Sequence, residues 1–107
     1  MQNLFDFNNL FFEWDDNKDI INFNKHGIRF STAIKIFKDP NLLIREDIEH
    51  SKEVRYNIIG KIKKILFVVC VLKEENTVRL ISARLATKNE KERYLGNGEN
   101  NNGRNQL

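Results

Sequence analysis

The stretch Leu66-Phe67-Val68-Val69-Cys70-Val71-Leu72 is apolar at every position and rich in β-branched residues. It is too short for a membrane span or an independent helix, and its length suits a β-strand. A strand that is apolar on both faces is buried on both faces, which places it in the interior of a sheet. The sequence therefore predicts a sheet built around this strand.

Two further strands are predicted beside it. Residues 53–60 lead into the central strand through the polar turn 61–64, and residues 77–85 follow it through the polar turn 73–76. Short turns join antiparallel neighbours, because a parallel connection needs a long crossover. The three strands are therefore predicted to form an antiparallel meander.

This meander predicts which side chains share a face. If the residues that flank each four-residue turn pair with one another, then Arg55, Cys70 and Arg79 lie in one row, with the arginines roughly 10 Å apart. A slip of one residue in either turn would break this row. The opposite face is predicted to be apolar and covered by helices, and it comprises Tyr56, Ile58, Phe67, Val69, Val71, Val78 and Leu80.

A first strand at residues 10–14 and a first helix are predicted upstream of the meander. Asp15 is the expected N-cap of the helix, and Gly27 is its expected left-handed stop. The apolar face that this helix is expected to bury consists of Ile20, Ile21 and Phe23.

Two more helices complete the predicted elements. Ser31 is predicted to cap the second helix, which ends at Asp39-Pro40 because proline cannot continue a helix. A short strand is expected within residues 41–44. Thr87 and Glu90 form a capping box for a last helix at residues 88–95. The predicted fold class is α+β, an antiparallel β-sheet with helices packed on one face.

The chain of 107 residues is long enough for one domain. We assign residues 10–95 to this domain, residues 1–9 to a lead-in and the Gly/Asn-rich residues 96–107 to a disordered tail. No signal peptide and no run of transmembrane length is visible, so we expect a cytoplasmic protein without a membrane. The single cysteine, Cys70, is interpreted as a buried small hydrophobe in a reducing compartment.

The net charge of +3 conceals an asymmetry between the two halves of the chain. Residues 1–50 contain 6 Lys/Arg and 9 Asp/Glu, whereas residues 51–107 contain 12 and 6. A basic half is typical of proteins that bind a polyanion such as nucleic acid. Solvated lysines at strand edges and turns are the alternative interpretation of the same charges.

Several short motifs occur in a fixed order within residues 10–95. They are Phe12-Glu13-Trp14-Asp15 with Lys18, Asn24-Lys25-His26-Gly27-Ile28 with Phe30, Ala33 and Phe37 with Asp39-Pro40, Glu53 and Arg55 ahead of Ile59-Gly60, Leu66-Phe67-Val68-Val69, Arg79-Leu80-Ile81-Ser82-Ala83-Arg84 with Ala86-Thr87, and Glu90, Arg93 and Tyr94. In this order and spacing the sequence resembles the BrnT family of bacterial type II toxin–antitoxin toxins.

The resemblance implies a RelE-like fold and a ribonuclease, acting on RNA without a cofactor, that inhibits translation. It also implies a partner, a BrnA-like antitoxin protein with a ribbon-helix-helix DNA-binding region. Operator DNA would then be bound only through the complex of toxin and antitoxin.

Cleavage of RNA without a metal requires that the 2′-hydroxyl loses a proton, that the phosphate is stabilised and that the leaving 5′-oxygen is neutralised. Arginine suits the second task, because its planar guanidinium pairs with phosphate oxygens. Arg55 and Arg79 are therefore the predicted phosphate clamp, with Glu53 as the acidic residue on the same strand face as Arg55. The alternative is that Glu53 forms only a surface ion pair with one of them.

Three more residues are catalytic candidates. Arg84 lies at the far end of its strand and belongs to the resemblance, His50 titrates near neutral pH, and Lys25 is a possible proton donor from a helix. The predicted RNA-binding residues are Lys61, Lys63 and Lys64 of the turn. A lysine-rich turn that prevents aggregation is the alternative for these three. The few Cys and His residues show no metal-ligand spacing.

Two other interpretations of the whole chain stay open. The chain could be a non-enzymatic, nucleic-acid-binding co-repressor subunit of a protein complex, or a toxin that has lost its chemistry and kept its partner surface. Its aromatic residues have the spacing of core residues and are not expected to stack on bases. An apolar patch left exposed is predicted to receive the antitoxin.

Overall fold

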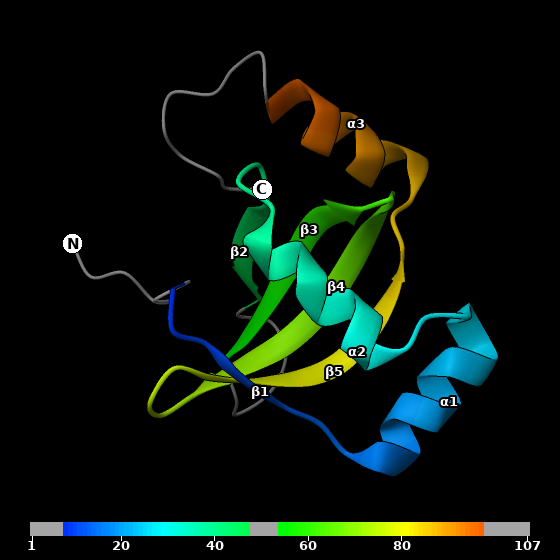
Figure 1. Cartoon of the computed structure of the whole chain (residues 1–107). Helices are drawn as coiled ribbons and strands as arrows, with labels where there is room; N and C mark the ends of the chain where they lie inside the picture. The colour runs from blue at the N-terminus through cyan, green and yellow to red at the C-terminus, as the bar shows by residue number, and fades with distance from the viewer. Residues whose placement is uncertain (1–7, 48–53, 98–107) are drawn as a thin grey trace.

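The computed structural model describes residues 8–47 and 54–97. Its centre is a five-stranded sheet in the order β1-β5-β4-β3-β2 (Figure 1). The strands are β1 (Phe11–Glu13), β2 (Leu43–Asp47), β3 (Arg55–Ile62), β4 (Lys64–Lys73) and β5 (Thr77–Leu85). The helices are α1 (Asp16–His26), α2 (Phe30–Ala33), the 3-10 helix η1 (Ile34–Lys38) and α3 (Lys88–Asn97).

The predicted central strand is the middle strand of the sheet. β4 lies between β3 and β5 and is antiparallel to both, which confirms the meander. β2 is antiparallel to β3, whereas β1 runs parallel to β5 at the other edge. The predicted α+β class is therefore confirmed. None of the helices in the described ranges has the length and hydropathy that a membrane span requires.

The register of the meander differs from the prediction, because β4 extends into both predicted turns. Lys63 alone separates β3 from β4 and adopts a left-handed conformation, with φ 62°. Each pairing is shifted by one residue, so that Val71 and not Cys70 lies between Arg55 and Arg79. The two shifts compensate across β4. The row of arginines is therefore retained, while the side chains of β4 change face.

One face of the sheet is covered by α2 and η1, and we call it the helix face (Figure 1). Its buried cluster contains Phe30, Ala33, Ile36 and Phe37 from the helices, with Tyr56, Ile58, Leu66, Val68, Cys70, Val78 and Leu80 from the strands. Cys70 is buried as predicted, and burial raises the pKa of its thiol to about 12. Such a thiol stays protonated at neutral pH and is a poor nucleophile.

The third helix lies on the other side of the sheet. Tyr94 of α3 packs with Leu43 and Ile59, which alternate along their strands with residues of the helix face. Its hydroxyl donates a hydrogen bond of 2.6 Å to the carboxylate of Asp39. α3 extends to Asn97, beyond its predicted end at residue 95. A central strand that is apolar on both sides needs cover on both sides, and helices on one face alone would not supply it.

The ends of α1 are as predicted, but its predicted buried face is wrong. The backbone of Gly27 is left-handed, with φ 74°, and the carboxylate of Asp15 caps the first turn. The predicted buried residues Ile20, Ile21 and Phe23 are exposed by 51%, 62% and 45%. α1 lies beside the part of β5 that β1 does not pair with, where backbone groups require hydrogen-bond partners, and it buries polar side chains for that reason.

Asn22 attaches α1 to the edge of β5. Of the described strands only β1 lies on this edge, and its pairing with β5 stops at Arg79. Beyond that point, the side-chain oxygen of Asn22 accepts from the N–H of Ala83 at 3.0 Å, and its Nδ2 donates to the carbonyl of Ala83 at 2.9 Å. Nδ2 also donates to the carbonyl of Ile28 at 2.9 Å. The side chain of Asn22 thus makes the backbone hydrogen bonds to β5 that a neighbouring strand would otherwise make.

Asp19 attaches α1 to α2. Its carboxylate accepts from the N–H of Phe30 at 2.8 Å and from Nε of Arg29 at 3.0 Å. Burial raises the pKa of Asp19, but these hydrogen bonds outweigh burial and the pKa is lowered. The prediction of Ser31 as the cap is wrong, because Ser31 lies inside α2 and Asp19 bonds the first N–H of that helix instead. The predicted stop at Asp39-Pro40 is confirmed, since η1 ends at Lys38.

Candidate active site

A row of mostly charged side chains crosses the sheet on the side opposite the helix face. The register aligns Glu13 of β1, Arg79 of β5, Val71 of β4, Arg55 of β3 and Asp47 of β2. We call this side of the sheet the arginine face. The two arginines lie two strand spacings apart, which is roughly 10 Å. Each has an acidic residue as its outer neighbour, so the row presents two cations with an acid at each end.

Glu13 is a defined partner of Arg79. Its Oε2 accepts from Nη1 of Arg79 at 3.0 Å and from Nζ of Lys73 at 3.2 Å. These hydrogen bonds lower the pKa of the Glu13 carboxyl, which is therefore ionised at neutral pH. The side chains of Glu13, Arg79 and Lys73 are 38%, 37% and 51% exposed. The cluster holds Arg79 in a fixed orientation and leaves it open to a ligand from solvent.

α3 covers only one end of the arginine face. The row next to the arginines consists of Ser82, Val69, Asn57 and Arg45. The row after it includes Phe67 and Ile59, and Tyr94 of α3 packs there. Among the described residues, no helix has its buried side chains over the row of Arg55 and Arg79. The described helices therefore leave this row accessible from the end that α3 does not cover, where the side chain of Arg79 is 37% exposed.

A β-bulge brings Arg84 to the arginine face. Arg84 follows Arg79 by an odd number of positions, and a regular strand would place the two side chains on opposite faces. The register of β4 with β5 shifts between Val69 and Cys70, so that Arg84 lies opposite Phe67. Arg84 and Arg79 consequently share a face. Bulges that re-aim a side chain are common beside active sites.

α3 holds the guanidinium of Arg84. Nη1 and Nη2 donate to the two carboxylate oxygens of Glu90 at 2.9 and 3.0 Å, and the group lies 4.1 Å from the ring centre of Phe67. Burial raises the pKa of Glu90, but the bonds from Arg84 and Thr87 outweigh burial and lower it. Thr87 and Glu90 also form the predicted capping box. Arg84 thus ties β5 to α3, with a third of its side chain exposed.

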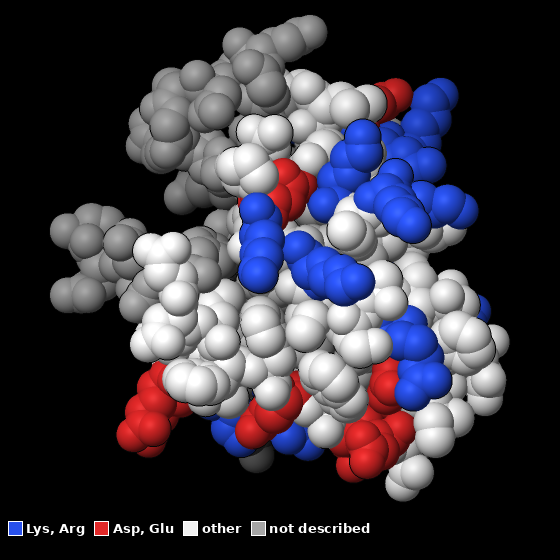
Figure 2. Space-filling view, viewed as in Figure 1, with Lys and Arg blue, Asp and Glu red and all other residues white. Residues whose placement is uncertain are grey.

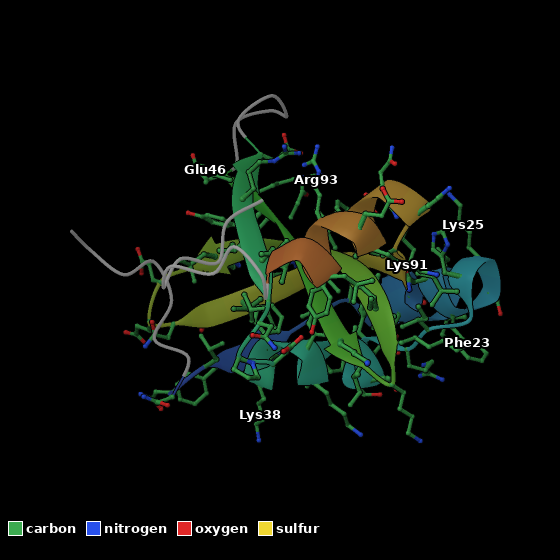
Figure 3. The ribbon with its side chains drawn as sticks, turned by 90° about the horizontal axis from the view of Figure 1, so that it is seen from above. Phe23, Lys25, Lys38, Glu46, Lys91 and Arg93 are labelled. Atoms are coloured by element: carbon green, nitrogen blue, oxygen red, sulfur yellow. The ribbon has the colours of Figure 1, made fainter. Side chains whose placement is uncertain are left out.

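Lys25 and the lysines of the β3–β4 turn lie away from the arginine row. Lys25 is exposed one turn beyond Asn22, on the side of the molecule where Lys91 of α3 also lies (Figure 3). Lys64 and Val71 are seven positions apart on β4, which corresponds to about 23 Å. The predicted RNA-binding residues Lys61, Lys63 and Lys64 are all exposed at that distant end of the sheet.

Two predicted site residues, His50 and Glu53, lie outside the described residues. Glu13, by contrast, joins the row without having been predicted, because the sequence did not show which strand β1 pairs with. Its signal was its place in the motif Phe12-Glu13-Trp14-Asp15. Within residues 8–47 and 54–97, no three Asp, Glu, His or Cys side chains are grouped as metal ligands.

A model of the protein family described as the ribonuclease toxin BrnT of type II toxin–antitoxin systems matches residues 14–90. The chain belongs to the BrnT family. The match includes Arg55, Arg79 and Arg84, and it begins one residue after Glu13. It confirms the resemblance and the function as a ribonuclease toxin that the sequence predicts. No curated protein sequence matches the chain.

The BrnT fold is also seen in a solved structure. The crystal structure of the Brucella abortus ribonuclease toxin BrnT is similar to this chain with a TM-score of 0.57 and 23% sequence identity. The likeness covers 74% of this chain and 99% of that one. At this identity it supports the fold, and it agrees with the mostly antiparallel α+β architecture described above.

Proposed function

We propose that this BrnT toxin cleaves RNA on the arginine face without a metal ion. In the proposed step, the 2′-oxygen forms a bond to the adjacent phosphorus and the bond from phosphorus to the 5′-oxygen breaks. The proton of the 2′-hydroxyl passes to a base, and the leaving 5′-oxygen takes up a proton. The products are a 2′,3′-cyclic phosphate and a 5′-hydroxyl. The observation that carries this proposal is the row that aligns Arg55 and Arg79 on one face of the sheet.

Arg55 and Arg79 are assigned to the phosphate. Negative charge builds on the phosphate oxygens as the pentavalent state forms, and fixed guanidinium groups stabilise that charge without reorganising. Glu13 is a positioning residue, because its carboxylate orients Arg79 through the 3.0 Å bond. Its lowered pKa makes it a weak base. We assign the proton transfers to the predicted residues His50 and Glu53, which precede β3 in the chain.

Arg84 and Lys25 are assigned to the RNA on one side of the cleaved bond. Arg84 lies on the arginine face two rows from Arg79, near the part of β5 that Asn22 attaches to α1. Lys25 lies one turn further along α1 and is exposed. Cations at these positions would bind the RNA backbone as it leaves the arginine row.

Kinetics of single and double variants test this assignment. Arg55→Ala and Arg79→Ala are each expected to lower kcat by about 10²–10³-fold, as for other donors that stabilise a transition-state charge. The double variant should lose less than the product of the two losses, because both groups act on one phosphate. Lys18→Ala, an exposed lysine on α1, is the matched control and should cleave at the wild-type rate. Activity that survives in both arginine variants would refute the proposal.

The partner is proposed to be a BrnA-like antitoxin, which binds operator DNA on behalf of the complex. Its docking surface is the outward face of α1, where Ile20 and Ile21 are more than half exposed. Apolar side chains of this size on one helix face are typical of an interaction site. Ile20→Asp should weaken capture of the co-expressed antitoxin at least tenfold and leave RNA cleavage unchanged, because Ile20 does not share the helix face of Lys25. Asn24→Asp on the same helix is the control for added charge.

Expression of the chain alone in cells distinguishes the enzyme from a co-repressor subunit. A ribonuclease in the cytoplasm, where its RNA substrates are translated, should arrest growth, and co-expression of the antitoxin should relieve the arrest. A co-repressor subunit should leave growth unaffected.

A further inference from the structure

Five lysines from two separate segments form one exposed cluster at the end of the sheet. We call it the lysine platform, and it consists of Lys35, Lys38, Lys61, Lys63 and Lys64. Lys35 and Lys38 are three residues apart in η1, and in a 3-10 helix such residues lie directly above one another. η1 therefore directs both lysines to the same side. Figure 3 shows Lys38 pointing outward on the side opposite Arg93 of α3.

Two contacts hold η1 against the turn that carries the other three lysines. Ile36 lies over Gly60, and a Cβ built on Gly60 would be 2.8 Å from the Cβ of Ile36. The carboxylate of Asp39 accepts from the N–H of Lys61 at 2.8 Å. Glycine at position 60 thus permits the close approach, and Asp39 fixes the turn. The lysines of both segments are positioned by packing and by a hydrogen bond.

All five lysines are exposed, and within the described ranges none of them forms an ion pair with a carboxylate. The nearby carboxylate of Asp39 already accepts bonds from Asn41, Lys61 and Tyr94. Figure 2 shows Lys and Arg gathered over η1, the β3–β4 turn and α3, with most Asp and Glu at the opposite end near the β4–β5 turn and the start of α1.

The platform is separate from the candidate active site. About 23 Å of β4 lie between Lys64 and the row of Arg55 and Arg79. Lys61 lies on the arginine side of β3 by alternation, while Lys35 and Lys38 project from the helix face. The cluster therefore continues around the end of the sheet, from one face to the other.

We infer that the lysine platform is a second RNA-binding surface, and that the substrate is a long or folded RNA that reaches both the platform and the arginine row. This inference rests on the proposed function and extends it to the class of substrate. Lysines act as point charges toward phosphates, which suits contact with the backbone. The large exposed apolar residues of the described chain lie outside η1 and the β3–β4 turn, so the platform offers no stacking surface for bases.

The double variant Lys35→Gln/Lys38→Gln tests the inference with two RNAs of different size. A folded RNA of transfer-RNA size should bind about 15-fold more weakly at 0.15 M salt, because each of the two lost phosphate contacts is a factor of about four under these conditions. The slope of log K against log salt should become less steep by about 1.4–1.8. Cleavage of a three-nucleotide RNA, which is too short to reach both sites, should stay at the wild-type rate.

Three controls separate the possible failures. Lys18→Gln removes one charge on α1 and should leave the salt slope unchanged, and urea unfolding should show that the double variant is folded. Binding is also measured in the Arg79→Ala background. If platform-dependent binding persists there while no cleavage is seen in the wild type, the chemistry fails and the platform stands. The inference would be overturned if the slope of log K against log salt for the folded RNA were unchanged, or if the double variant lost activity equally on both RNAs. It would also be overturned if the platform bound only an acidic protein.

Discussion

Asn22 is expected to be a main source of stability for the contact between α1 and the sheet. Asn22 is 6% exposed, and its side chain makes three hydrogen bonds, two with the backbone of Ala83 and one with the carbonyl of Ile28. Asn22→Ala removes all three bonds and leaves one N–H and two carbonyls without the partner that they now share.

The expected loss follows from these bonds. A hydrogen bond in a protein contributes about 1 kcal/mol net, and an unsatisfied buried group costs about 1–3 kcal/mol. Three bonds therefore correspond to about 3 kcal/mol of the free energy of unfolding, and to a fall in Tm of about 12–24 °C for a domain of this size. Part of the loss would be recovered if water reached Ala83.

Urea unfolding followed by circular dichroism measures the effect, with Asn24→Ala as the matched control on the same helix. Asn24 is exposed, and its replacement should change the free energy of unfolding by less than about 0.5 kcal/mol. The amide of Ala83 should also exchange faster with solvent in Asn22→Ala. If Asn22→Ala were within 1 kcal/mol of Asn24→Ala, the account of Asn22 as a strand substitute would be refuted.

Three other changes test separate contacts. The pKa of Asp19 is lower in the folded chain than in the unfolded chain, so the unfolded state binds more protons and stability should fall as the pH drops below about 4; Asp19→Asn should flatten that part of a pH series of urea midpoints. Glu90→Gln breaks the paired bonds to Arg84 and should lower the free energy of unfolding by about 0.5–1 kcal/mol, since both side chains are partly exposed. A double-mutant cycle with Arg84→Ala measures the coupling energy of this pair, and a smaller value would contradict the prediction. Gly60→Ala forces a Cβ to 2.8 Å from Ile36 and should cost about 1–3 kcal/mol in thermal unfolding, with recovery by Ile36→Ala as the check on steric cause.

The sequence was sufficient for the elements that depend on local signals. The apolar run of β4, the cap at Asp15, the stop at Gly27 and the capping box of Thr87 and Glu90 all act within a few residues of the chain. Composition and turn chemistry determine such features, and the predictions based on them are confirmed. The order of elements followed from the same signals.

The sequence did not determine the register in which β3, β4 and β5 pair. Whether Lys63 adopts a left-handed conformation decides how many residues form the turn, and a lysine gives no signal for that choice. The error reversed the faces of β4, and only a matching error in the second turn kept Arg55 and Arg79 in one row. The bulge that brings Arg84 to the arginine face is likewise invisible in the pattern of apolar residues.

The burial of α1 was mispredicted because a nonlocal contact outweighs its hydrophobic pattern. Asn22 accepts a hydrogen bond from the backbone N–H of Ala83, which is far away in the sequence. Asp19 accepts one from the backbone N–H of Phe30, which is on the next helix. Ile20 and Ile21 consequently face outward. Glu13 was missed for a similar reason, since its role depends on the parallel pairing of β1 with β5.

Incubation of purified protein with RNA in EDTA, with analysis of the product ends, tests the central claim most directly. The wild type should cleave in the presence of the chelator and leave a 2′,3′-cyclic phosphate and a 5′-hydroxyl, and Arg79→Ala should lose this cleavage. Cleavage that stops in EDTA and returns with Mg²⁺, or that continues at the wild-type rate in Arg79→Ala, would contradict a metal-independent site on the arginine face.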